Sequence, residues 1–150
     1  MKFLQPVLAT LLTLSTLFAS NEGLVVKQTN QSVNKVIEHL NSTLSANGFT
    51  IFAVIDHAAG AKKVGLMLRD EQLIIFGNPK GGTLLMNENA NFGIDLPMKI
   101  LAYSNEDGST NVVYNNPIFL QERYGVENSK KIIGKMQGLF SKLMQGVEAK

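Results

Sequence analysis

The hydrophobic positions along the chain follow two periods, one typical of helices and one typical of strands. Between Ser32 and Gly48, apolar residues recur every three or four positions, which predicts an amphipathic helix capped by Ser32. A longer amphipathic helix is predicted over residues 129–147, with Ser129 as its N-cap. Each of these helices has one apolar side, so each needs another element to pack against.

Short runs rich in β-branched and aromatic residues predict five strands, at residues 24–29, 49–56, 73–76, 99–104 and 110–115. The run 49–56 is apolar at both alternating sets of positions, which predicts a strand in the interior of the sheet. The polar turn 105–108 predicts a hairpin, and Tyr103 and Tyr114 are expected to face each other across it. Two shorter helices are predicted over residues 58–65 and 79–86.

The first twenty residues have a pattern of their own. Lys2 is followed by an apolar run over residues 4–18, and small residues close the segment at Ala19 and Ser20. This pattern predicts a secretory signal peptide over residues 1–20. A membrane anchor is the alternative, but the apolar run is shorter than the roughly 20 residues that span a bilayer. We therefore expect a periplasmic or secreted protein without a membrane span after cleavage, whose single α+β domain occupies residues 21–150.

Composition narrows the chemistry. The chain has no cysteine, which excludes disulfides, thiolate nucleophiles and zinc-thiolate sites. Its formal net charge of +2 is too small for a nucleic-acid footprint, so no nucleic-acid partner is expected. The motifs G-x-S-x-G, H-E-x-x-H and C-x-x-C do not occur, and there are two histidines. An enzyme built on this chain would depend on carboxylates, lysines or His57, and the sequence identifies no cofactor.

Asp56 and His57 end the second predicted strand and are the first candidate site. A carboxylate beside an imidazole suits proton transfer or metal ligation. The alternative is structural, with Asp56 capping the Ala-rich helix that follows and His57 bonded to a local backbone group. The other histidine, His39, falls away from the apolar side of its helix and is expected to be solvated.

Two further candidate sites follow later strands. The segment 77–83 (GNPKGGT) resembles loops that bind phosphate at a helix start, with Asn78 and Lys80 as the residues of interest. It matches neither established phosphate-loop pattern, and a tight turn capped by Asn78 is the alternative. Asp95 and Lys99 flank a proline at the entry to a strand, where Lys99 is either a partly buried amine or a lysine whose head reaches water.

Four sequence words then occur in order: GFTIFAVIDH (48–57), LIIFGNPKGGTLLM (73–86), DLPMKILAY (95–103) and VVYNNP (112–117). Together they resemble the domain-of-unknown-function 302 (DUF302) family, from about Gly48 to Tyr124. The resemblance implies an α+β fold with an antiparallel sheet of about four to five strands, covered on one side by helices in a TATA-binding-protein-like arrangement. It also implies a homodimer. It supplies no activity and no catalytic residue.

Three functions fit these observations. The first is an exported, homodimeric binding module for a small molecule or anion, held by the strand-end residues Asp56, His57, Asn78, Lys80, Asp95 and Lys99. The second is a small periplasmic enzyme that uses His57 or Asp56 as general acid or base. The third is a metal carrier, with His57 and carboxylates contributed by two subunits.

Overall fold

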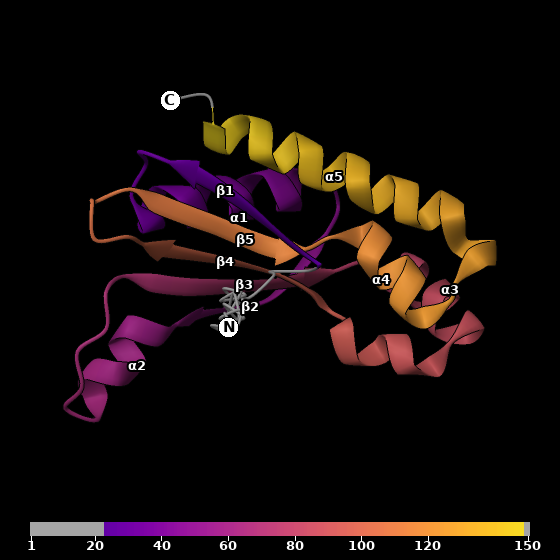
Figure 1. Cartoon of the computed structure of the whole chain (residues 1–150), viewed down its shortest axis with the longest axis horizontal. Coiled ribbons are helices and arrows are strands. Elements are labelled where there is room, and N and C mark those ends of the chain that lie inside the picture. The colour runs from indigo at the N-terminus through magenta and orange to yellow at the C-terminus, as the bar shows by residue number, and fades with distance from the viewer. Residues whose placement is uncertain (1–22, 149–150) are drawn as a thin grey trace, which may run out of the picture.

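The computed structural model describes residues 23–148, and five strands form one antiparallel sheet within them (Figure 1). The strands are β1 (Leu24–Thr29), β2 (Thr50–Asp56), β3 (Glu71–Gly77), β4 (Met98–Ser104) and β5 (Thr110–Asn115). Their order across the sheet is β1-β5-β4-β3-β2, so β4 is central and β1 and β2 are the edges. The prediction of an α+β fold with an antiparallel sheet is confirmed. The predicted signal peptide lies outside the described residues.

The helices are placed on one face and at the two ends of this sheet (Figure 1). The long helices α1 (Val33–Ala46) and α5 (Lys130–Glu148) cover the face, and α2 (His57–Lys63) stands off one end. At the other end lie α3 (Pro79–Glu88), α4 (Pro117–Tyr124) and the 3₁₀ helices η1 (Ala90–Asp95) and η2 (Glu127–Ser129). No helix among residues 23–148 is long and apolar enough to cross a bilayer.

The main core fills the space between the sheet and its two long helices. Leu40 of α1 and Phe140 of α5 pack against Ile100 of β4, together with the neighbouring apolar residues of these elements. Phe140 stacks on the Tyr114 ring, with 4.2 Å between ring centroids and 5° between ring planes. A second cluster, which includes Leu85 and Phe92, joins α3, η1, α4 and α5 at the sheet end.

The opposite face of the sheet, which we call the open face, also carries apolar side chains. Its middle row crosses all five strands in register and consists of Val26, Val113, Leu101, Leu73 and Ile55. None of these residues belongs to a buried cluster of the described chain. Phe52 is 54% exposed, Leu24 44% and Val26 43%. The sheet therefore has two apolar faces, and the helices cover one of them.

The prediction of an interior position for residues 49–56 is wrong, because β2 is an edge strand. The two apolar sides are real: Ile51 packs on the main core, whereas Ile55 lies on the open face and is 40% exposed. A change of register between Ile51 and Ala53 adds an irregularity to this edge. The apolar residues on the second side of β2 lie on the open face of the sheet, and they do not indicate that a further strand flanks β2.

Other local expectations also change. Helix α4, which begins at Pro117 after the Asn116 cap, was not predicted. Ser129 does not cap α5 with its side chain, because η2 leads into α5 and the Ser129 hydroxyl donates to Glu88 at 2.6 Å. The sequence pattern predicted only a strand end at Pro117 and an ordinary helix cap at Ser129. The structure has a helix at the first position and a side-chain contact to Glu88 at the second.

The two tyrosines of the hairpin do not face each other. Tyr103 pairs with Asn111 and lies on the open face, whereas Tyr114 pairs with Ile100 and lies in the core. Successive residues of a strand point to opposite faces of the sheet, so the observed register places the two tyrosine rings on opposite faces.

His39 is half-buried and not fully solvated. Its ring lies against Gly146 of α5, and Nε2 is 3.3 Å from the Leu143 carbonyl oxygen, to which it donates. The absence of a side chain at Gly146 makes room for the imidazole.

Candidate functional site

A cleft opens between α3 and α5, at the end of β3 and the start of β4, and encloses about 330 Å³. It lies where the two buried clusters meet: Phe49 and Leu139 belong to the border of the main core, and Leu85 and Met136 to the second cluster. Met98 of β4 contacts both. The floor of this α3–α5 cleft is therefore apolar.

The rim of the cleft is formed by the start of α3. Asn78 caps this helix by accepting a hydrogen bond from the Lys80 backbone N–H at 3.0 Å, and Pro79 occupies the first turn. The backbone N–H groups of Gly81 and Gly82 donate to the Asn78 carbonyl oxygen. The capping alternative is thus confirmed, and these N–H groups have internal acceptors. An anion here would bind through side chains and not through a backbone cradle.

Two lysines give the cleft its charge. Lys80 on α3 and Lys135 on α5 line it and are exposed, and no carboxylate is among its lining residues. Neither lysine forms an ion pair within the described residues. An apolar floor under two unpaired ammonium groups suits a ligand with an acidic head and an apolar body.

Asp95, at the end of η1, is held by a separate cluster. Its side chain is 14% exposed and lies 3.5 Å from the Arg123 guanidinium. Asp95 also accepts a 2.5 Å hydrogen bond from the Tyr124 hydroxyl, and the Asn115 amide donates to it at 3.4 Å. The hydrogen bond from the Tyr124 hydroxyl to Asp95, with a smaller contribution from burial, raises the pKa of Tyr124. The contacts tie η1 to α4 and β5, so the carboxylate is engaged in holding this end of the fold together.

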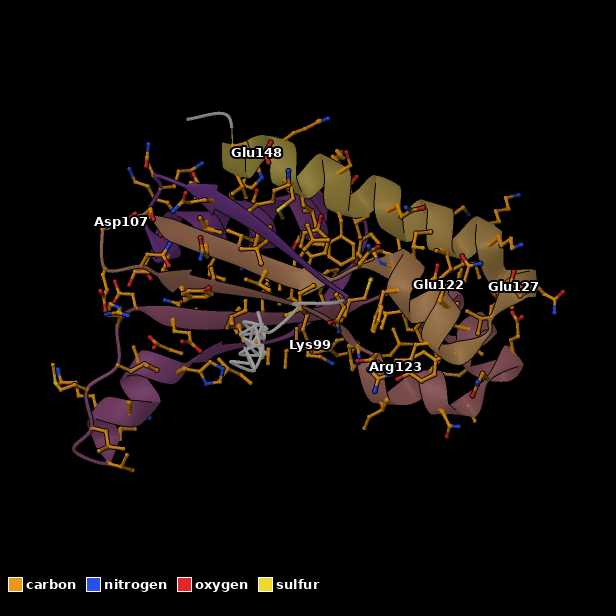
Figure 2. All side chains as sticks on the ribbon, viewed as in Figure 1. Lys99, Asp107, Glu122, Arg123, Glu127 and Glu148 are labelled. Atoms are coloured by element: carbon orange, nitrogen blue, oxygen red, sulfur yellow. The ribbon has the colours of Figure 1, made fainter. Side chains whose placement is uncertain are left out.

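The remaining predicted residues are spread over the sheet. Lys99 lies on the open face and its ammonium donates to the Pro97 carbonyl oxygen at 3.1 Å (Figure 2). Asp56 caps α2 by accepting from the Ala59 N–H at 2.7 Å, and His57 is the first residue of that helix. Asn78 and Lys80 meet in the α3–α5 cleft, whereas Asp56, His57, Asp95 and Lys99 do not line it.

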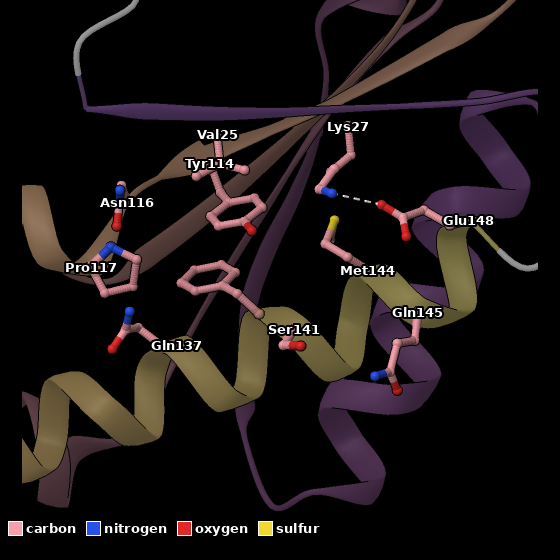
Figure 3. Close-up of a pocket in the computed structure, with 11 residues that line it drawn as sticks. Val25, Lys27, Tyr114, Asn116, Pro117, Gln137, Ser141, Met144, Gln145 and Glu148 are labelled. Carbon is pink, nitrogen blue, oxygen red and sulfur yellow. Dashed lines mark ion pairs between the residues drawn. The ribbon is translucent and has the colours of Figure 1, made fainter.

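A second hollow, the β1–α5 groove, lies on the other side of α5 and is drawn in Figure 3. It encloses about 450 Å³ between β1 and the polar residues Gln137, Ser141 and Gln145 of α5. Its charges pair with each other, because the Lys27 ammonium lies 3.0 Å from the Glu148 carboxylate. Burial raises the pKa of Tyr114 in its wall. The groove therefore has no unpaired charge to recognise an ion.

Comparison with known protein families assigns the chain to one of them. The model of the family described as "Domain of unknown function DUF302" matches residues 25–143. The chain belongs to this family. The match is longer than the sequence words indicated, since it includes β1 and most of α5, and the resemblance to DUF302 is confirmed.

Relatives of this DUF302 chain include two proteins named as fluoride channels. "Fluoride-specific ion channel FluC 1" of Brucella suis biovar 1 (strain 1330) is 37% identical over 112 residues, which are 75% of this chain and 44% of the relative. "Fluoride-specific ion channel FluC 2" of Brucella melitensis biotype 1 has the same identity over 42% of its length. The chain thus spans less than half the length of these relatives.

A solved structure supports the fold. The "Crystal structure of uncharacterized conserved protein DUF302 from Bacillus stearothermophilus" superposes with a TM-score of 0.73 at 20% sequence identity. The match covers 84% of this chain and 98% of the other. At this identity, the likeness concerns the DUF302 fold alone.

Several residues of these sites were missed by reasoning from sequence. Lys135 borders the apolar side of the predicted C-terminal helix, and only the packing of α3 and α5 places it on the same cleft as Lys80. Tyr124 belongs to the unpredicted helix α4. A usable signal was present, because Asn116–Pro117 repeats the cap-and-proline start of Asn78–Pro79.

Proposed function

We propose that this DUF302 protein is an exported binding module for a small amphipathic anion, which it holds in the α3–α5 cleft. The observation that carries the proposal is the pairing of an apolar floor with Lys80 and Lys135 at its rim. An acidic head between the two ammonium groups would leave an alkyl or aromatic body against Leu85, Met136 and Leu139.

The same observations favour binding over proton-transfer chemistry. The carboxylate of Asp56 serves as a helix cap and is exposed, and neither Asp56 nor His57 lines the α3–α5 cleft or the β1–α5 groove. Within residues 23–148 of one copy, no group of three or more His, Cys, Asp or Glu side chains gathers, so a metal carrier would need ligands from a second subunit. Export and a homodimeric state belong to the proposal as well, and a native mass measurement of the isolated protein tests both.

Binding of decanoate, a plain alkyl carboxylate, tests the cleft by isothermal titration calorimetry. We expect the double variant Lys80→Gln/Lys135→Gln to weaken binding by about tenfold or more, since each lost charge-assisted contact contributes roughly 1–3 kcal/mol. Gly81→Leu should block binding, because a Cβ at Gly81 already points toward Ile132 of the cleft wall at 3.8 Å. Lys142→Gln is the matched control, because Lys142 is an exposed α5 lysine bonded to Asn47 away from the cleft.

Sodium fluoride and inorganic phosphate are titrated in parallel, because the relatives named as fluoride channels make a small inorganic anion the competing ligand. Loss of decanoate binding in both cleft variants, with Lys142→Gln unchanged, supports the proposal. Absence of decanoate binding, or binding that the cleft variants leave unchanged, contradicts it. Fluoride or phosphate binding without any effect of an alkyl chain would also contradict it.

A further inference from the structure

The open face of the sheet has the composition of an interface. Its middle row of five aliphatic residues is centred on Leu101 of β4, the central strand. A polar row lies on one side of it and consists of Gln28, Asn111, Tyr103 and Glu71. On the other side, Lys99 pairs in register with Ile75, and Ile75 with Ala53. The Lys99 ammonium thus lies on one side of the aliphatic row and the Glu71 carboxylate on the other.

We infer that a second copy of this chain packs on the open face, about a twofold axis that passes through Leu101 and runs perpendicular to the strands. The inference rests on the homodimeric state proposed above and adds the surface and its symmetry. It is independent of the α3–α5 cleft, which lies on the helix-covered side of the sheet.

The direction of the axis follows from the charges. Rotation about an axis perpendicular to the strands exchanges the two ends of the sheet, so Lys99 of one copy lies over the partner's Tyr103 and beside the partner's Glu71. An axis parallel to the strands would place the two Lys99 ammonium groups against each other in a desolvated interface. Like charges so placed oppose association, so the perpendicular axis is the one that the side chains favour.

The size of the face is sufficient for a specific contact. Five strands at about 4.8 Å spacing and six residues at about 3.3 Å give a face of roughly 24 Å by 20 Å. Two such faces amount to roughly 1,000 Å², the size at which specific interfaces begin.

The exposed apolar residues at the two ends of the sheet fit the same axis. After α2 the chain carries Val64, Leu66, Met67 and Leu68, which are 72%, 65%, 98% and 45% exposed. At the other end of the sheet, Phe52 and Ile94 are 54% and 76% exposed. Because the perpendicular axis exchanges the two ends, it brings the segment 64–68 of each copy toward the partner's Phe52 and Ile94.

The chain has no cysteine, so single introduced cysteines report the arrangement directly. Facing sheets lie about 10 Å apart, which is too far for a disulfide but suits a short bis-maleimide linker. Leu101→Cys should crosslink with itself in high yield, whereas Glu38→Cys, exposed on α1, should not. Lys99→Cys mixed with Tyr103→Cys should give crosslinked heterodimers, and Lys99→Cys alone should give few.

A second variant keeps the test independent of crosslinking. Leu101→Lys should remain folded by circular dichroism and raise the dimer dissociation constant at least about 100-fold in analytical ultracentrifugation, because it buries an unpaired charge. A wild-type dimer that neither Leu101 variant affects would overturn this interface while leaving the homodimer standing. A monomer at all concentrations would overturn both, as would a monomer that binds anionic lipid vesicles through the open face. Efficient self-crosslinking of Lys99→Cys would overturn the perpendicular axis.

Discussion

Both faces of the sheet carry aliphatic side chains, and they differ in what covers them. On the covered face, Ile74, Phe76, Ile100 and Val112 are fully buried beneath α1 and α5. On the open face, Leu73, Ile75, Leu101 and Val113 alternate with them along the same strands and are only partly buried. Alternation along a strand usually separates an apolar face from a polar one, and here it separates two apolar faces. The difference shows that the described chain supplies a cover for one face only.

Neighbouring residues of β4 allow the strongest test of this comparison. Ile100→Ala should lower the free energy of unfolding by about 2–5 kcal/mol, because it leaves a cavity in the main core. Leu101→Ala, one residue away on the open face, should lower it by roughly 1 kcal/mol in dilute solution, where the face is solvated. Urea unfolding of both variants measures the difference.

Protein concentration sharpens the same comparison. The effect of Ile100→Ala should not depend on concentration, whereas that of Leu101→Ala should grow as the wild-type protein associates. Equal and concentration-independent losses at the two positions would show that the open face is not covered by a second copy.

A smaller effect is expected on the covered side, where α5 packs on α1. Gly146→Ala should destabilise the protein by about 1–3 kcal/mol, because the new Cβ would overlap the His39 ring. Gly138→Ala is the matched control in the same helix, since its Cβ would meet no atom within 4 Å. That control should stabilise by up to about 1 kcal/mol through helix propensity. Thermal unfolding of both variants, and rescue of Gly146→Ala by His39→Ala, would verify the contact.

The smallest expected effect is a change in pH dependence where α3 meets the start of α5. Hydrogen bonds from the Ser129 hydroxyl and the Asn128 N–H lower the pKa of Glu88 below its ordinary value of 4.5. A carboxyl with a lowered pKa stabilises the fold above its unfolded pKa, and this stabilisation is lost as pH falls through the folded pKa. Glu88→Gln should therefore flatten the decline in stability below pH 4.5, as measured by urea unfolding across that range. An unchanged slope would mean that these hydrogen bonds do not favour the ionised form.

The sequence by itself determined most of the local elements of this protein. The strands β1 and β5 were predicted with the observed bounds, and α1 and the long C-terminal helix to within about one residue. It also located Asn78 and Asp56 as helix caps, because caps depend on side chains two or three residues away. Helix α4 was missed, although its Asn116–Pro117 start carried the same local signal.

Tertiary structure alone decided which of these elements meet. Whether residues 50–56 form an interior or an edge strand depends on strand order, and an apolar pattern on both sides is the same in either position. Lys135 approaches the α3–α5 cleft, and Tyr124 approaches Asp95, through packing between elements far apart in sequence. Short-range periodicity fixes which side of an element is apolar, but the partner for that side is chosen by long-range packing, and here the open face keeps an apolar side that the described chain does not cover.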